Sequence, residues 1–233
     1  MRKRVVFLDI DGTLIDSKNA GRAAFIRALH SAFGWTDDID YIKFSGATDL
    51  DVLKKIFTRY QRKLSEQDIE LFFDMLPREL RRTCAENRPI TLPGVREMLD
   101  ELAMREDTLV GLVTGNIESC ARIKLAAAGI DHHFPLGAFG HEHADRNEIA
   151  RLALARAEGM LAPNESLGQI FIIGDSPADV AAAHAIGAFA LAVATGHPSA
   201  EELAAAGADL LVEDLGGIAE KLLSPGETDG RPC

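Results

Sequence analysis

The clearest pattern in the sequence is a short, unbroken run of apolar residues close to its start. Residues 5–8 are all apolar, and they lead directly into Asp9 and Asp11. A continuous apolar run of this length is typical of a strand buried on both faces, as in a parallel sheet. Gly12 follows and allows the backbone to turn sharply. The pattern therefore predicts a buried strand that delivers two carboxylates to its carboxyl end.

Further apolar runs, at residues 108–114, 170–173 and 188–194, alternate with helical patterns. Strands that alternate with helices predict an α/β fold built on a doubly wound parallel sheet. Binding and catalytic sites in such sheets form outside the carboxyl ends of the strands. Thr114 and Asp175 end two of the later strands, so we expect them to lie near the two aspartates of the first strand.

The stretch between the first strand and residue 88 contains no buried parallel strand. Helices are expected over residues 17–33, 49–60 and 65–84. Asp16 or Ser17 is expected to cap the first of them. We interpret residues 17–88 as a helical cap domain inserted into an α/β core of residues 1–16 and 89–223. Residues 224–233 have the composition of a disordered tail.

Composition and charge narrow the class of protein. The chain has 233 residues and a formal net charge of -11, which argues against general binding to nucleic acid or anionic membranes. No apolar stretch approaches transmembrane length. The three cysteines, Cys84, Cys120 and Cys233, show no metal-binding spacing and fit a reducing cytoplasm. We expect a cytoplasmic monomer or homodimer that acts on a small molecule.

Two carboxylates at the carboxyl end of a buried strand repel each other, which is unfavourable unless a cation balances their charge. Oxygen ligands of this kind suit Mg²⁺. A calcium loop is excluded, because its fifth and sixth positions are Thr13 and Leu14 here. The alternative is an ordinary Asp-Gly turn with solvated acids.

Four sequence motifs, in order, resemble those of the haloacid dehalogenase superfamily, in its phosphatase branch with a helical cap. The first is Asp-Ile-Asp-Gly-Thr at residues 9–13, and the second is Thr-Gly-Asn at residues 114–116. The fourth is Gly-Asp-Ser-Pro-Ala-Asp at residues 174–179. The third motif is a single basic residue, for which Arg146 is our choice. Lys124 is the alternative, although a solvated lysine in mid-helix is the simpler interpretation of that position.

The resemblance implies a chemistry for the acidic residues. Asp9 would be the nucleophile and form an aspartyl-phosphate. Asp11 would protonate the leaving group and then activate water, a change of role that suits a carboxyl whose pKa is raised by neighbouring acids. Mg²⁺ would be held by Asp9, the backbone carbonyl of Asp11 and Asp175. Asp179 would support these metal ligands without binding the metal directly, or it would pair with the basic residue.

The resemblance also implies a set of phosphate-binding groups. Thr114 would donate its hydroxyl, and Gly115 or Asn116 a backbone N–H, to a phosphoryl oxygen. Arg146 would bind the phosphate through its planar guanidinium. The other interpretation of Arg146 is a solvent-facing arginine. Residues 195–197 are expected either to line the mouth of the site or to form an ordinary turn.

The cap is expected to select the substrate. Its candidate contact residues are Arg22, Lys43, Ser45, Gly46 and Thr48. The implied activity is hydrolysis of a small phosphomonoester, with phosphoglycolate as the first substrate to test. Two alternatives remain open, a sugar phosphomutase similar to β-phosphoglucomutase and a non-catalytic binding module on the same fold.

Overall fold

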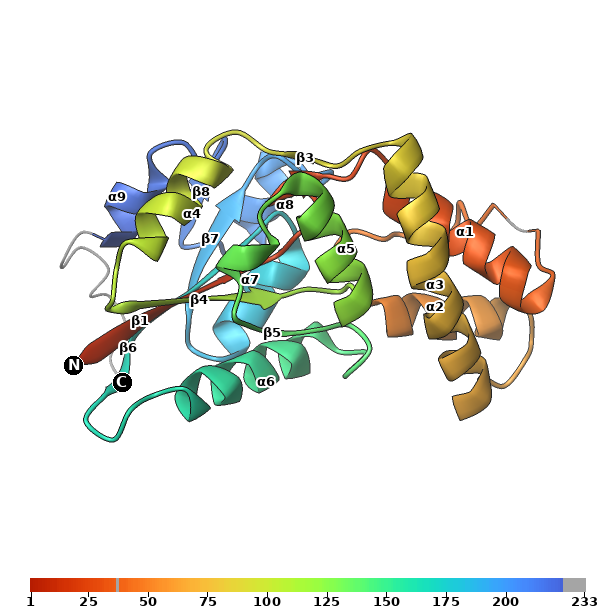
Figure 1. Ribbon diagram of the computed structural model, residues 1–233, viewed down its shortest axis with the longest axis horizontal. Helices are drawn as coiled ribbons and strands as arrows, with labels where there is room; N and C mark the ends of the chain where they lie inside the picture. Colours follow the sequence, from red (N-terminus) through yellow and green to blue (C-terminus); the bar gives the residue numbers. More distant parts are fainter. Residues whose placement is uncertain (37, 224–233) are drawn as a thin grey trace.

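A parallel sheet forms the centre of the computed structural model, which describes residues 1–36 and 38–223 (Figure 1). Its strands are β1 (Arg2–Leu8), β4 (Thr108–Val113), β5 (Leu136–Ala138), β6 (Ser166–Gly174), β7 (Phe189–Val193) and β8 (Leu210–Val212). The six strands lie in the order β5-β4-β1-β6-β7-β8, and all neighbours are parallel. The predicted doubly wound α/β fold is confirmed. The predicted tail at residues 224–233, with Cys233, lies outside the described residues.

Helices cover both faces of the sheet, which explains the unbroken apolar run in β1. Val6 and Leu8 pack into the core formed with α4 (Val95–Ala103), α5 (Glu118–Ala128) and α9 (Ile218–Leu223). Val5 and Phe7 point the other way, because successive side chains of a strand alternate in direction. They pack into the core formed with α6 (Arg146–Gly159), α7 (Pro177–Ala185) and α8 (Ala200–Ala205). Both faces of β1 are therefore buried, and its carboxyl end opens at the centre of the sheet.

Three helices lie beside the sheet as a separate group, in orange to yellow in Figure 1. They are α1 (Ala20–Phe33), α2 (Asp49–Arg59) and α3 (Glu66–Glu86). They have their own core, in which the rings of Phe25 and Phe72 lie 4.7 Å apart. A short antiparallel ribbon, β2 (Ile15–Asp16) with β3 (Ile90–Thr91), joins them to the sheet. The domain bounds at residues 16, 88 and 223 remain a prediction.

The helix starts show where local signals decide the structure. Thr48 caps α2, and Ser65 caps α3 in a reciprocal box with Asp68. The predicted start of α1 at Asp16 or Ser17 is wrong. The Asp16 carboxylate accepts the N–H of Lys18 at 2.8 Å, and α1 begins only at Ala20.

The remaining element is a 3₁₀ turn, η1 (Asp131–His133), before β5. Within the described residues, no helix has both the length and the apolar character needed to cross a membrane.

Candidate active site

Polar side chains gather at the carboxyl end of the three central strands. Asp9 follows β1, Thr114 follows β4 and Asp175 follows β6. Because β1 pairs with both other strands in parallel, these three residues end at the same edge of the sheet. Asp179 joins them from the first turn of α7. The sheet topology therefore brings together residues that lie more than a hundred positions apart in the chain.

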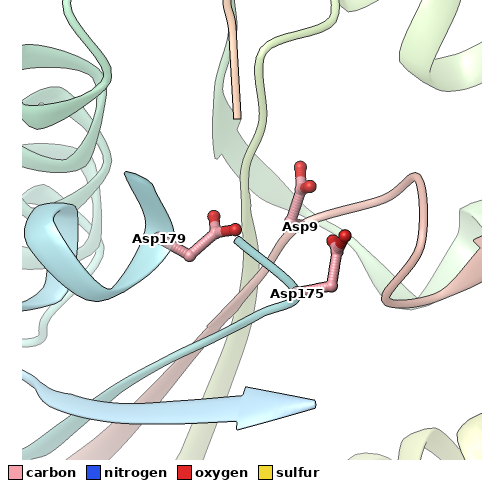
Figure 2. A group of neighbouring side chains, drawn as sticks. All are labelled: Asp9, Asp175 and Asp179. Atoms are coloured by element: carbon pink, nitrogen blue, oxygen red, sulfur yellow. The ribbon is translucent and has the colours of Figure 1, made fainter. Parts of the chain in front are cut away.

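Asp9, Asp175 and Asp179 form a buried cluster of carboxylates. Figure 2 shows the three side chains around one small space at the ends of their elements. One oxygen from each lies within 4.8 Å of the others, and each residue is at most 6 % exposed. Three adjacent buried carboxylates are unfavourable unless cations balance them.

Arg146, the first residue of α6, supplies one balancing charge. Its Nη2 lies 2.8 Å from Oδ1 of Asp9 and 2.6 Å from Oδ1 of Asp179, and it donates to the carbonyl of Val113 at 3.0 Å. The residue is only 5 % exposed, so the interpretation as a solvent-facing arginine is wrong. Burial alone would lower the pKa of Arg146, but the carboxylates of Asp179 and Asp9 outweigh it and raise that pKa. The guanidinium is therefore permanently charged in this site.

The pKa values of two of the carboxyl groups, Asp175 and Asp179, are also raised, but for an acid this means that the charged form is disfavoured. Burial, and then the charges of Asp9 and Asp179, raise the pKa of Asp175. Burial also raises the pKa of Asp179, although Arg146 opposes the shift. The Ser176 hydroxyl and backbone N–H both donate to Oδ2 of Asp179, at 2.6 and 3.0 Å. With all groups ionised, three negative charges face one positive charge, and the cluster lacks two positive charges.

A divalent cation fits that deficit and that set of oxygens. The backbone around Asp175 is built for close approach. A Cβ at Gly196 would lie 1.8 Å from Oδ2 of Asp175, and a Cβ at Gly12 would lie 2.6 Å from the same atom. Thr13 donates to Oδ1 of Asp175 at 3.0 Å, and Thr195 donates to the Gly12 carbonyl at 2.6 Å. The carboxyl of Asp175 is thus held in place by two turns, while Asp9 faces it from the position directly after β1.

Asp11 belongs to a second, distinct cluster. Its Oδ2 lies 2.6 Å from Nζ of Lys124, on α5, and accepts a hydrogen bond from Nδ2 of Asn116 at 2.9 Å. Lys124 also donates to Oδ1 of Asn116 at 2.7 Å, and Nδ2 of Asn116 donates to Oγ1 of Thr114 at 2.9 Å. Lys124 is 4 % exposed, so the interpretation as a solvated lysine is wrong. The backbone N–H of Asn116 points to Oγ1 of Thr114 at 3.3 Å, inside the loop.

The expected pKa of Asp11 is also corrected. Neighbouring acids were expected to raise it, and burial does act in that direction. The charge of Lys124, together with hydrogen bonds from Lys124, Asn116 and Ser17, outweighs burial and lowers the pKa of Asp11. The carboxyl is therefore ionised in the resting site.

The comparisons with known proteins agree with this geometry. The family model for haloacid dehalogenase-like hydrolases matches residues 6–184, which is most of the chain. This chain belongs to the haloacid dehalogenase-like hydrolase family. The predicted family and the prediction of a hydrolase are confirmed. No curated protein matches the chain.

Solved structures share the fold of this haloacid dehalogenase-like hydrolase over almost its whole length. A hydrolase from Pseudomonas syringae is 22% identical, with a TM-score of 0.70 and coverage of 95% of this chain and 98% of that one. CbbY from Rhodobacter sphaeroides, solved with xylulose-(1,5)bisphosphate, is 21% identical, with a TM-score of 0.71 and coverage of 93% and 96%. A predicted phosphoglycolate phosphatase from Haemophilus somnus 129pt is 22% identical, with a TM-score of 0.65 and coverage of 95% and 98%.

The loop before α2 covers the site of this haloacid dehalogenase-like hydrolase. Gly46 lies against the fourth motif, because a Cβ there would be 2.7 Å from Cβ of Ala178 and 2.9 Å from Oγ of Ser176. Thr48 is buried, and its hydroxyl donates to the carbonyl of Ala144 at 3.0 Å, just before Arg146. Two of the predicted cap residues, Gly46 and Thr48, are therefore brought to the site.

Asp49, which the sequence analysis missed, fastens the same loop to the second motif. Its N–H donates to the carbonyl of Gly115 at 2.8 Å, and its carboxylate accepts the N–H of Ile117 at 2.8 Å. Burial raises the pKa of Asp49 to about 6, although Lys124 opposes the shift. The available signal was its position directly after the helix-capping Thr48.

The other cap candidates are not drawn into the site of the haloacid dehalogenase-like hydrolase. Arg22 forms an ion pair with Asp40 and donates to the carbonyl of Asp38 at 2.8 Å, all within the cap. Lys43 and Ser45 are exposed.

Proposed function

We propose that this hydrolase is a Mg²⁺-dependent phosphatase that cleaves a small phosphomonoester through an aspartyl-phosphate on Asp9. The observation that carries the proposal is the placement of Asp9. Its carboxylate ends the central strand, faces Asp175 and contacts the guanidinium of Arg146. Asp11 follows two residues later with its own cationic partner. A nucleophile, a fixed positive charge and a proton-transferring group then lie at one strand end, as phosphoryl transfer requires.

In the first step, a carboxylate oxygen of Asp9 attacks the phosphorus atom. The bond between phosphorus and the ester oxygen breaks, and its electron pair goes to the leaving oxygen. Asp11 is ionised at rest, so it first takes up a proton from the solvent as the negatively charged substrate arrives. It then donates that proton to the leaving oxygen, so that an alcohol leaves. Arg146 would neutralise charge on the phosphoryl oxygens, and the Thr114 hydroxyl and the N–H of Gly115 would donate hydrogen bonds to them.

In the second step, water attacks the phosphorus atom of the aspartyl-phosphate. Asp11, now a carboxylate, takes the proton from that water. The bond between phosphorus and the Asp9 oxygen breaks, which restores the Asp9 carboxylate and releases inorganic phosphate. The lowered pKa of Asp11 favours this base role at neutral pH.

Mg²⁺ would be held by the carboxylates of Asp9 and Asp175 and by the backbone carbonyl of Asp11. When bound, it supplies charge neutralisation and aligns the phosphoryl group with the nucleophile. The support for this assignment is the deficit of two positive charges in the carboxylate cluster and its purely oxygen donor set. Asp179 would hold Arg146 rather than the metal, because its Oδ1 lies 2.6 Å from the guanidinium and its Oδ2 accepts both hydrogen bonds from Ser176.

The proposed substrate is small, because the loop of residues 45–49 lies directly over the second and fourth motifs. Phosphoglycolate remains the first candidate, and one solved structure of the same fold is described as a predicted phosphoglycolate phosphatase. Another was solved with a sugar bisphosphate, which supports sugar phosphates as the second class to test. A cytoplasmic location and a monomeric or homodimeric state are part of the proposal.

The test is steady-state phosphate release from a panel of phosphomonoesters, with Mg²⁺ and with EDTA. The panel holds phosphoglycolate, sugar phosphates, nucleoside monophosphates and pyridoxal phosphate. Release that requires Mg²⁺ and prefers one substrate supports the proposal. Conversion of a sugar phosphate to its isomer without phosphate release would favour a phosphomutase, and no turnover of any kind would favour a binding module.

A further inference from the structure

The two carboxyl oxygens of Asp11 have different surroundings. Oδ2 is held by Nζ of Lys124 at 2.6 Å and by Nδ2 of Asn116 at 2.9 Å. The Ser17 side chain also interacts with this carboxyl group. Oδ1 is buried, and no hydrogen bond of normal geometry reaches it from the residues that the structure describes. A buried, unpaired carboxyl oxygen costs free energy, which makes it a natural place for a proton or a substrate group. The carboxyl is thus clamped on one oxygen and open on the other.

The clamp depends on Lys124, a lysine whose charged group is buried at an energetic cost. Lys124 lies in the middle of α5, whose other buried residues are Cys120, Ala121, Leu125 and Ala128. Removing an ammonium from water is unfavourable, and its ion pair must offset that desolvation. An apolar side chain of similar length would fill this position at lower cost. Packing alone therefore does not account for a lysine here.

The cap leaves room for this lysine. A Cβ at Gly21, in the first turn of α1, would lie 3.0 Å from Nζ and 3.4 Å from Cε of Lys124. Any larger residue at this position would press on the ammonium. Lys124 therefore extends from α5 into a space that the cap and Asp11 enclose.

We propose that Lys124 is a positioning residue for proton transfer, which with Asn116 fixes Oδ2 of Asp11 so that Oδ1 is the oxygen that gives and takes the proton. This inference rests on the proposed phosphatase function and deepens it. In the first step the O–H bond at Oδ1 breaks and a bond from that hydrogen to the leaving oxygen forms. The ammonium then faces the carboxylate that remains, and its charge stabilises that product of the transfer.

The leaving group distinguishes this role from general damage to the fold. An alkoxide needs a proton as it leaves, whereas p-nitrophenolate is stable without one. General acid catalysis typically contributes at least ~100-fold to the rate. We expect Lys124→Met to lower kcat/KM for phosphoglycolate by about 100-fold and for p-nitrophenyl phosphate by less than about 10-fold. Asp11→Asn should also lose more kcat/KM with the alkyl ester than with p-nitrophenyl phosphate, and the difference should be larger.

A second variant tests the clamp without removing its charge. Gly21→Ala inserts a single methyl group against the Lys124 ammonium, while alanine favours the helical backbone more than glycine does. It should lower kcat/KM for the alkyl ester by roughly 3- to 10-fold more than for p-nitrophenyl phosphate, because a displaced clamp weakens but does not abolish proton transfer. Gly159→Ala in α6, where a Cβ meets open space, is its matched control. Lys54→Met, at an exposed position in α2, controls for the loss of a lysine, and both controls should match the wild type.

Each outcome decides a separate claim. If both Lys124→Met and Gly21→Ala lower kcat/KM equally for the two substrates, or raise KM without lowering kcat, the positioning role is overturned while the phosphatase stands. If Lys124→Met fails to fold, as judged by circular dichroism, the ratio measured for Gly21→Ala alone decides. If the wild type releases no phosphate from any ester, the proposed function is overturned and this inference with it.

Discussion

Two buried cations, Arg146 and Lys124, approach the end of the same strand from opposite faces of the sheet, and they do different work. Arg146 bridges Asp9 and Asp179 with its guanidinium, at 2.8 and 2.6 Å. Lys124 contacts the single carboxylate Asp11 at 2.6 Å. The planar guanidinium suits several oxygens at once, whereas an ammonium is a compact point charge. The arginine side thus still lacks positive charge, while the lysine side is balanced and sets the direction of one carboxyl group.

The largest effect should come from the proposed nucleophile, Asp9, on the arginine side. Asp9→Asn removes the attacking carboxylate but keeps its shape, so we expect phosphate release to fall by at least ~1000-fold, as for other covalent nucleophiles. Circular dichroism should show a folded chain, because the uncharged amide also relieves the crowded carboxylates. Near wild-type release by Asp9→Asn would show that the nucleophile is another residue.

The next effect compares the two cations by stability. Arg146→Met leaves three buried carboxylates without their cation and should lower the free energy of unfolding by about 3–5 kcal/mol. Lys124→Met should cost less, about 1–3 kcal/mol, because the Asp11 side chain is 34% exposed and keeps its bond from Asn116. Urea denaturation measures both.

Added Mg²⁺ sharpens that comparison. It should restore part of the stability of Arg146→Met, because a ligand that binds only the folded state stabilises it. It should restore none of the loss in Lys124→Met beyond the effect seen in the wild type. Equal restoration in the two variants would contradict the division into two clusters.

The two clusters should also respond to pH in opposite directions. The pKa of Asp175 is raised to about 8 and that of Asp179 is raised as well, so the metal-free folded state binds more protons than the unfolded state above the usual carboxyl pKa of 3.8. Stability from this cluster therefore falls as pH rises toward 8. The pKa of Asp11 is lowered, so its contribution is present above 3.8 and is lost as pH falls below that value.

We expect the free energy of unfolding in EDTA to decline by about 2–4 kcal/mol between pH 5 and pH 8, since one pKa unit is worth about 1.4 kcal/mol. Asp175→Asn should make this decline smaller, and Mg²⁺ should remove most of it. Urea titrations at three pH values measure the slope. A free energy that rises across this window in EDTA would contradict the charge deficit.

The smallest effect belongs to a cation outside both clusters. Arg22 pairs with Asp40 on the cap, at side-chain exposures of 35% and 72%. Exposed ion pairs contribute little, so Arg22→Met should change the free energy of unfolding by less than about 0.5 kcal/mol and leave kcat/KM unchanged. A rise in KM of tenfold or more in Arg22→Met would instead indicate that Arg22 contacts the substrate.

Much of the core was predictable because its signals are local. The apolar run of β1 predicts a strand buried on both faces, and the structure confirms it. The helix starts predicted near residues 49 and 65 are also confirmed. Asp9, Asp175 and Thr114 could be expected together because parallel strands end at one edge of the sheet. Arg146 was found because a cation at a helix start needs a reason, and the acidic cluster supplies it.

The rest of the site depends on contacts between segments far apart in the chain. Lys124 is one turn from Cys120 and from Ala128, within a buried stripe of α5, but a lysine there looks solvated until the cap closes over it. The lowered pKa of Asp11 follows from that lysine, so both errors share one cause. The contacts of Asp49 depend on how the cap lies against the core, and those of Arg22 depend on how the cap itself folds. No local sequence pattern predicts either.

The most direct test of the account is to trap the intermediate on Asp9. The enzyme is mixed with p-nitrophenyl phosphate and Mg²⁺, quenched within a turnover and reduced with borohydride, which converts an aspartyl-phosphate into homoserine. Peptide mass spectrometry should then find homoserine at position 9 in the wild type and in Lys124→Met, and none in Asp9→Asn. Unmodified Asp9 in a sample that releases phosphate, or homoserine at another aspartate, would contradict the central claim.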